Sequence, residues 1–176
     1  VLDYAQLLPV APGPVATLGQ RALRAADEIG RLELETLLDA SAGVLLRKEK
    51  TLVKAQLSWL DKIARREPAR LGDIMATVAV AFGHTALDLQ ERALTIVGKH
   101  VGKLHPDEIA RLADDAIQLG GDLPARAAAL FGTTIDEPDP VDAAVALPPP
   151  PPPAEMPPPI AGPDELAEEI GVLVHE

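Results

Sequence analysis

The sequence predicts an all-α fold, an α-solenoid of about three helical hairpins with a period of about 36 residues, followed by a disordered proline-rich acidic tail. Leu, Ala and Val supply most apolar positions and aromatic residues make up 2% of the chain, which favours packed helices over sheets. Apolar residues before position 132 recur with helical spacing. Similar stripes then return at offsets of 35 and 36 residues, the range typical of stacked helical repeats.

Charge divides the chain into two parts. Residues 132–176 hold ten acids, 12 of the 18 prolines and no Lys or Arg, so they carry nearly all of the formal net charge of -11. Residues 1–131 are close to neutral and have the length of one ordinary domain. The chain has no cysteine for a disulfide scaffold or a Cys-based metal or redox site, and no apolar run long enough for a membrane span, so we expect no membrane partner.

The first part is expected to begin irregularly and then to turn helical. Residues 1–13 are predicted to be an irregular lead-in to a helical-repeat domain over 14–131. Helices are predicted over 14–28, 33–47 and 49–67. Ser41 and Gly43 stand inside the second of these and should weaken it.

Three further helices and a short closing one are predicted from their start and stop signals. Pro68, Thr85 and Pro106 stand where a helix begins, Gly120 stops the third helix, and residues 124–131 close the domain. Their apolar stripes are Leu71, Ile74, Met75, Val78 and Phe82; Leu89, Ala93, Ile96 and Val97; and Ile109, Leu112, Ala113, Ala116 and Ile117.

The repeat becomes visible when three of these helices are superposed. The superposition aligns Leu18, Val53 and Leu89; Ala22, Leu57 and Ala93; and Ala25, Leu60 and Ile96. A helix pair cannot bury its own apolar face, so neighbouring pairs should complete one continuous core.

Residues 53–66 and 86–100 resemble HEAT or armadillo-type repeats, which implies a HEAT-like fold. The runs LLRKEKTLVKAQLSWLDKIARREP and AFGHTALDLQERALTIVGKH resemble a helical-repeat region of large bacterial proteins grouped as a domain of unknown function. The likeness covers about residues 14–131 and implies no particular activity. HEAT-like solenoids also include DNA-base glycosylases that use Trp, Asp and Arg, and Trp59, Asp61 and Arg65 offer those types. Because one helix points these three in different directions, and because the sequence has no phosphate loop, nucleophile elbow or HExxH motif, we expect no enzyme, cofactor or metal site.

The tail divides into a connector and a short helix. Residues 132–162 should be a disordered linker whose run of prolines at 148–153 favours polyproline II, as a spacer in preference to a ligand for proline-reading modules. Residues 163–176 should form a short amphipathic helix that packs on the repeats or begins a next domain. Since the chain also opens without Met, we expect a fragment of a larger cytoplasmic protein.

The strongest local feature is a basic stretch at residues 47–70, with eight bases and three acids. It predicts either a strip that binds phosphates or a soluble face with local ion pairs. Separately, Gln56 and Gln90 lie inside apolar arcs and are expected to make hydrogen bonds that fix the register of neighbouring repeats. The candidate polyanion-binding residues are Arg47, Lys50, Lys54, Arg65 and Arg66.

Helical solenoids usually present an extended surface to a partner. We therefore predict a non-catalytic protein-interaction scaffold with an unidentified protein partner. The alternative is a polyanion or nucleic-acid binding module that uses the basic helix face at residues 47–70. A further hypothesis is an intramolecular contact between the acidic tail and that basic helix.

Overall fold

The structure is a computed structural model that describes residues 2–132, 162–164, 166 and 170. The chain forms two compact units, residues 1–136 and 137–176, each considered by itself. The predicted linker falls almost wholly outside the described residues, as does the acidic tail of the hypothesised intramolecular contact. In the second unit Pro163, Asp164, Leu166 and Ile170 are helical, and the Leu166 amide donates to the Gly162 carbonyl at 3.1 Å.

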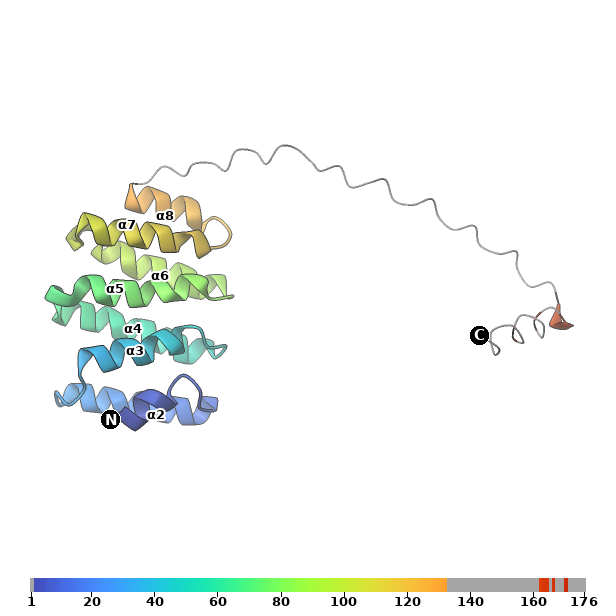
Figure 1. The fold of residues 1–176 in the computed structure, drawn as a ribbon, viewed down its shortest axis with the longest axis horizontal. Coiled ribbons are helices and arrows are strands. Elements are labelled where there is room, and N and C mark those ends of the chain that lie inside the picture. Colours follow the sequence, from blue (N-terminus) through green and yellow to red (C-terminus); the bar gives the residue numbers. More distant parts are fainter. Residues whose placement is uncertain (1, 133–161, 165, 167–169, 171–176) are drawn as a thin grey trace. The chain divides into compact units, whose positions relative to one another are not determined.

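The first unit is built from α-helices and short 3-10 turns, with no strand among the described residues, so the predicted all-α class is confirmed. Figure 1 shows these helices piled one above another. Their bounds are α1 (Leu2–Leu7), α2 (Gly13–Glu28), α3 (Leu34–Leu45), α4 (Lys50–Arg66), α5 (Leu71–Ala79), α6 (Leu87–His100), α7 (Pro106–Asp115) and α8 (Leu123–Phe131).

The helices alternate between two layers. The odd-numbered helices pack on one another in succession, as do the even-numbered ones (Figure 1). Across the layers α1 packs on α2, α3 on α4, α5 on α6 and α7 on α8. One hydrophobic core runs between the layers from Ala5 to Ala127, as expected when each helix pair covers the next.

The predicted irregular lead-in at residues 1–13 is wrong for its first half, because residues 2–7 form α1. Ala5 and Leu8 are buried, and α1 packs on both α2 and α3. Two buried positions are too few to make a periodic signal in the sequence, and so short a helix is stabilised by packing and not by propensity. The described part of this unit therefore holds four helix pairs, where the sequence suggested three and a closing helix.

Ser41 and Gly43, which the sequence led us to expect would weaken the second helix, do not interrupt it. α3 runs unbroken through Ser41 and Gly43. The Ser41 hydroxyl donates to the Leu37 carbonyl one turn earlier at 2.6 Å and accepts from Gln56, so this buried polar group is satisfied inside the helix. A Cβ atom at Gly43 would lie 2.7 Å from the Cβ of Pro9, so the glycine leaves room for the chain between α1 and α2.

The repeat register proposed from sequence is wrong for the first helix. Leu18 is 64% exposed, whereas Val53 and Leu89, which the sequence aligned with it, are fully buried. That alignment matched apolar residues at offsets of 35 and 36, but an apolar residue type does not say which side of a helix faces the core. Burial instead recurs every 37 residues along the chain, in the sets Ala16, Val53 and Gln90; Gln20, Leu57 and Leu94; Leu23, Leu60 and Val97; Leu37 and Ile74; Leu38 and Met75; and Leu45 and Phe82.

Candidate interaction surface

A groove of about 470 Å³ runs between α4 and α6 on the even-numbered layer. It is polar, because both helices turn long charged side chains toward it while their apolar stripes face the core. Its charged lining consists of the cations Lys62, Arg65, Arg92 and Lys99 and the carboxylates Asp61, Asp88 and Glu91.

Asp61 is the most buried charged group of this groove. Its Oδ1 accepts from Nε2 of the buried His100 at 3.0 Å, and its Oδ2 pairs with Arg65 at 2.5 Å and with Lys99 at 3.7 Å. Burial acts to raise the pKa of Asp61, but the hydrogen bond from His100 and the charges of Lys99 and Arg65 outweigh it and hold that pKa below its ordinary value. Through His100 and Lys99, Asp61 links α4 to the C-terminal end of α6.

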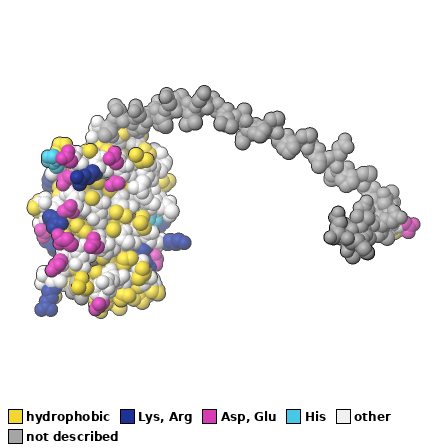
Figure 2. Space-filling model, in the orientation of Figure 1, with side chains coloured by type: hydrophobic (Ala, Val, Ile, Leu, Met, Phe, Trp, Pro, Cys, Tyr) yellow, Lys and Arg dark blue, Asp and Glu magenta, His cyan; other side chains and the backbone are white. Residues whose placement is uncertain are grey.

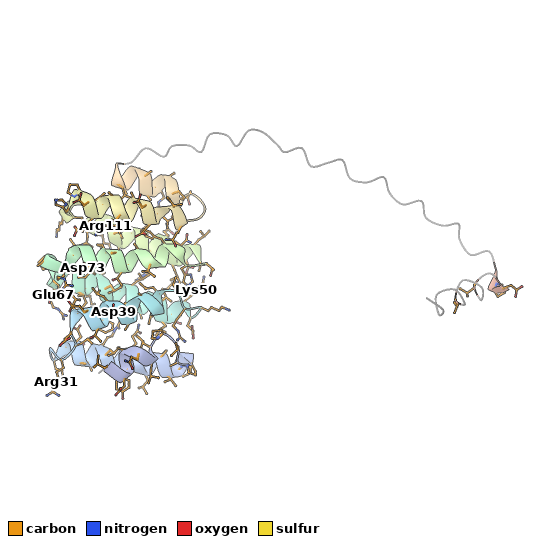
Figure 3. All side chains as sticks on the ribbon, in the orientation of Figure 1. Arg31, Asp39, Lys50, Glu67, Asp73 and Arg111 are labelled. Carbon is orange, nitrogen blue, oxygen red and sulfur yellow. The ribbon has the colours of Figure 1, made fainter. Side chains whose placement is uncertain are left out.

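Two of the predicted polyanion-binding residues share one acid. Lys50 and Lys54 lie one turn apart on α4 and contact the two oxygens of Asp88 on α6 at 2.7 and 2.9 Å. Their hydrogen bonds lower the pKa of Asp88 to about 2. Figure 3 places Lys50 at one edge of the stack and Glu67, just beyond the other end of α4, at the opposite edge.

Arg66, another predicted polyanion-binding residue, belongs to the junction between α2 and α4. Its Nη2 pairs with Oδ1 of Asp27 on α2 at 2.5 Å, and the indole N–H of the buried Trp59 donates to Oδ2 of the same carboxylate at 3.0 Å. The Arg24 guanidinium lies 5.3 Å from the centre of the Trp59 ring. Trp59 is thus enclosed between helices, which removes it as a platform for stacking a base.

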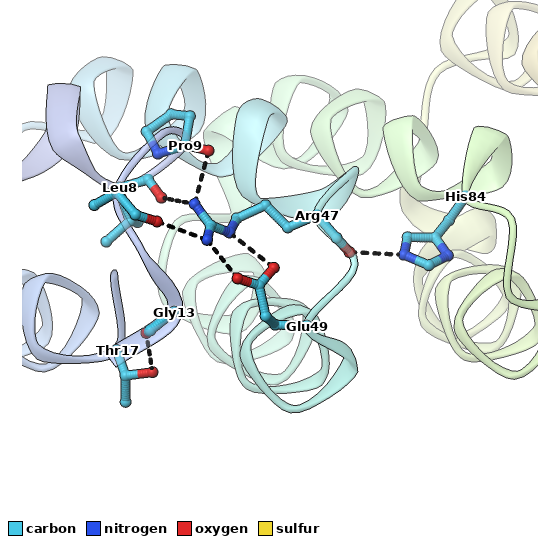
Figure 4. Close-up of polar contacts among 8 residues, drawn as sticks. Leu8, Pro9, Gly13, Thr17, Arg47, Glu49 and His84 are labelled. Atoms are coloured by element: carbon cyan, nitrogen blue, oxygen red, sulfur yellow. Dashed lines mark hydrogen bonds and ion pairs between the residues drawn. The ribbon is translucent and has the colours of Figure 1, made fainter. Parts of the chain in front are cut away.

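Arg47 does not belong to the basic face at all. Its guanidinium is nearly buried and donates to the carbonyls of Leu8, Pro9 and Ala11 at 3.0, 2.7 and 2.7 Å (Figure 4). It also pairs with Glu49 at 2.6 Å. These bonds close the connection between α1 and α2 against the end of α3, so Arg47 is a structural residue.

The same edge of the stack continues through His84. Because the Ala86 amide donates to Nδ1 of His84, the ring proton lies on Nε2, which donates to the Arg47 carbonyl at 2.9 Å (Figure 4). Gln90 then donates to the His84 carbonyl at 2.6 Å and accepts from the Gly120 amide at 2.9 Å. We call this run from Arg47 through His84 and Gln90 to Gly120 the edge ladder; it joins the loops of all four helix pairs.

The second predicted structural amide, Gln56, lies in the core between α2, α3 and α4. Its Oε1 accepts from Gln20 at 2.7 Å and its Nε2 donates to the Ser41 hydroxyl at 2.6 Å. Gln20 also donates to the Leu52 carbonyl at 3.2 Å. The side-chain amide of Gln56 is thus bonded on both sides, which fixes the rotation of three helices relative to one another.

Sequence reasoning missed the acids that face the basic stretch from other helices. Asp27, Glu35 and Asp88 pair with Arg66, Arg70 and Lys50 at separations of 39, 35 and 38 residues. Such separations, close to the repeat period, were the available signal, because residues one period apart lie on neighbouring helices. The local ion pairs that the sequence suggested are also present among the described residues: Arg47 with Glu49, Arg65 with Asp61, Arg66 with Glu67 and Arg70 with Asp73.

Two further features of the described residues limit the chemistry of this surface. In that part of the chain no group of three or more His, Cys, Asp or Glu side chains is arranged to hold a metal ion. None of the helices described there combines the length and apolar character that a bilayer crossing requires.

In comparisons with known proteins, no protein family, curated protein or solved structure matches this chain. The resemblance to HEAT-type repeats therefore stays a prediction from the residues.

Proposed function

We propose that this chain is a non-catalytic protein-interaction scaffold, built as a HEAT-like α-solenoid, that binds an acidic segment of a partner protein in the groove between α4 and α6. The single observation that carries the proposal is the charge arrangement of this groove. Its cationic side chains come from two helices that a continuous core holds in place, so the surface is formed before a partner arrives.

The architecture supports a solenoid in two ways. Burial recurs every 37 residues in both layers. In the edge ladder, successive loops are joined by hydrogen bonds between a side chain and the backbone of the neighbouring loop. A stack of this kind presents the side chains of equivalent helices along one face, and that is how helical-repeat proteins bind extended partners.

We infer an acidic partner because some cations of the groove already pair with a carboxylate of this chain and others, among the described residues, do not. Arg65 and Lys99 share Asp61. Within residues 2–132, Lys62 makes no ion pair and Arg92 bonds only the neutral hydroxyl of Ser58 at 2.8 Å. Lys62 and Arg92 thus offer two positive charges to the carboxylates of a partner, while Asp88 and Glu91 exclude long acidic runs.

Affinity capture with a matched control tests the proposal. The double variant Lys62→Glu/Arg92→Glu reverses both free cations, and the control Arg111→Glu reverses an exposed cation on α7 (Figure 3). We expect a bound protein that the wild type and Arg111→Glu retain equally and that the groove variant loses. Identical sets of bound proteins for all three would contradict the proposal.

The polyanion alternative has one supporting observation, which is the excess of one cation over the carboxylates in the groove. The ion pairs of Lys50, Lys54, Arg65 and Arg66 count against it. Binding of mixed-sequence duplex DNA in a salt titration decides between the two functions. Strong binding at low salt that falls steeply with salt, and that is lost when those four residues become Ala, would favour the alternative.

The cytoplasmic location expected from the sequence, and the place of this chain within a larger protein, stay predictions.

A further inference from the structure

We propose that the outer face of the α1–α2 pair is a dimer interface that binds the same face of a second copy of this chain. The face lies at one end of the stack, away from the groove between α4 and α6 and from its proposed partner. It therefore does not depend on the proposed function.

Large apolar side chains are exposed at this end of the stack. Half of the exposed large apolar residues that the structure describes fall within residues 2–18, and Figure 2 shows apolar side chains gathered there with few charges between them. A small apolar hollow joins Tyr4 and Leu7 of α1 to Val15 and Leu18 of α2. Scattered apolar residues are ordinary on a protein surface, but a continuous patch over two helices marks an interface.

α2 has two apolar faces. Ala16 and Leu23 face the core beside Gln20, whose bond to Gln56 marks the side toward α4. Val15, Leu18, Ala22 and Ala25 form a second helical stripe, and it includes the residues that the sequence aligned with buried positions of α4 and α6. Two apolar faces are typical of a helix inside the stack, with neighbours on both sides.

A second copy of the chain fits this face in charge. Among the charged residues of α1 and α2, Arg24 and Asp27 are bonded to α4, and Asp3, Arg21 and Glu28 are exposed. By helical spacing Asp3 shares a face with Leu7 and Arg21 shares a face with Leu18. In the proposed dimer the two-fold axis sets Asp3 of each copy against Arg21 of the other, so the face complements itself in charge as well as in apolar character.

The other end of the stack does not offer a comparable partner. The outer face of α7 carries Asp107, Arg111 and Asp114, and Ile117 is the large apolar residue exposed there among the described residues. Joining the apolar end to this charged end would bury charges without partners and would also extend without closing. A closed dimer through α1 and α2 avoids both costs.

The experiment measures molecular mass by sedimentation over a micromolar concentration series. The whole chain should shift from 18.5 kDa toward twice that mass as concentration rises. Leu18→Glu should weaken self-association by about a hundredfold, because the face then buries an unpaired carboxylate in each copy. The matched control Ile117→Glu places the same change at the charged end and should leave the mass unchanged.

Charge reversal distinguishes a specific dimer from non-specific association. Arg21→Asp should weaken the dimer by about tenfold, and the double variant Asp3→Arg/Arg21→Asp should restore it, since the swapped pair again matches across the two-fold axis. Helix content by circular dichroism should stay the same, because all of these side chains are exposed. A mass of 18.5 kDa at every concentration, an unaffected Leu18→Glu dimer, or no restoration by the double reversal would each overturn the proposal.

Discussion

The α1–α2 end and the α7–α8 end of the stack pack similarly on their inner sides and differ in the chemistry of their outer sides. Residues 2–28 contain five charged side chains, of which Asp3 is the one before residue 21, whereas residues 105–132 contain seven. Large apolar side chains are exposed at the first end and, apart from Ile117, not at the second within the described residues. A polar outer face suits contact with water, whereas an apolar outer face suits contact with a further surface.

The junctions next to the two ends also differ. Between α2 and α4, Asp27 is nearly buried and accepts from both Trp59 and Arg66. Between α6 and α8, Arg126 and Glu91 pair at 2.7 Å but about half of each side chain is exposed. The end that exposes apolar surface is thus the end attached by buried polar contacts, which suits an element that holds its shape for a partner.

The largest expected effect on stability comes from removing the hydrogen bonds that the Arg47 side chain makes in the edge ladder, next to the α1–α2 end. Arg47→Met leaves the carbonyls of Leu8, Pro9 and Ala11 without their donor, and we expect a loss of about 2–4 kcal/mol in the free energy of unfolding. Urea denaturation measures the loss, and hydrogen exchange should locate it in residues 2–11. The control Arg111→Met on α7 should change stability by about 0.5 kcal/mol or less. Similar losses in both variants would remove the distinction between the two ends.

The next largest effect is expected at the junction between α2 and α4, and the junction between α6 and α8 serves as its comparison. Asp27→Ala removes an acceptor that two groups share and should cost about 1–3 kcal/mol. Glu91→Ala breaks an exposed pair and should cost about 0–1 kcal/mol. Urea midpoints at one pH suffice for the measurement. If the two costs were equal, burial would not be what separates the junctions.

These contrasts also show what could be predicted from sequence. Helices with strong apolar periodicity, such as the one through Ile74 and Val78, were found, because a core-facing stripe leaves a local pattern. α1 was missed, since Ala5 is its one buried residue and Leu8, the next buried position, lies just beyond its end. The stripe through Leu18 was identified but assigned to the core, because a sequence shows that a face is apolar and does not show what covers it.

The same limit applied to the candidate site: the sequence showed its charges but not what they contact. The basic stretch at residues 47–70 was visible, yet its neutralisation was not, because its partners Asp27 and Asp88 lie on other helices. Arg47 was grouped with that stretch on charge alone, although its role depends on three backbone carbonyls some 36 to 39 residues away. Long-range contacts of this kind become predictable only once the 37-residue register is known.

A smaller effect is expected when the pH is lowered, and it comes from Asp88 on α6. The ion pairs with Lys50 and Lys54 lower the pKa of Asp88 to about 2, so between its ordinary value of 3.8 and 2 the unfolded chain binds more protons than the folded one. This contribution to stability is present above the ordinary pKa and is lost as pH falls through that window. Asp88→Asn should therefore make the decline of stability shallower between pH 3.8 and 2, as thermal melts would show. An unchanged decline would mean that the ion pairs add nothing to stability.

The smallest expected effect is a gain in stability, and it comes from Asp115 at the α7–α8 end. Burial and the neighbouring charge of Asp114 raise the pKa of Asp115 above its ordinary value, so its contribution to stability is present below that value and is lost as pH rises. Asp115→Asn should stabilise the fold at neutral pH by about 0.5 kcal/mol or less, and the gain should vanish in acid. A comparison of urea midpoints at neutral and acid pH measures this difference, and a destabilised variant at neutral pH would contradict it. Such a gain would mean that the α7–α8 end keeps the adjacent acids Asp114 and Asp115 at some cost in stability, as expected of a face that stays in water.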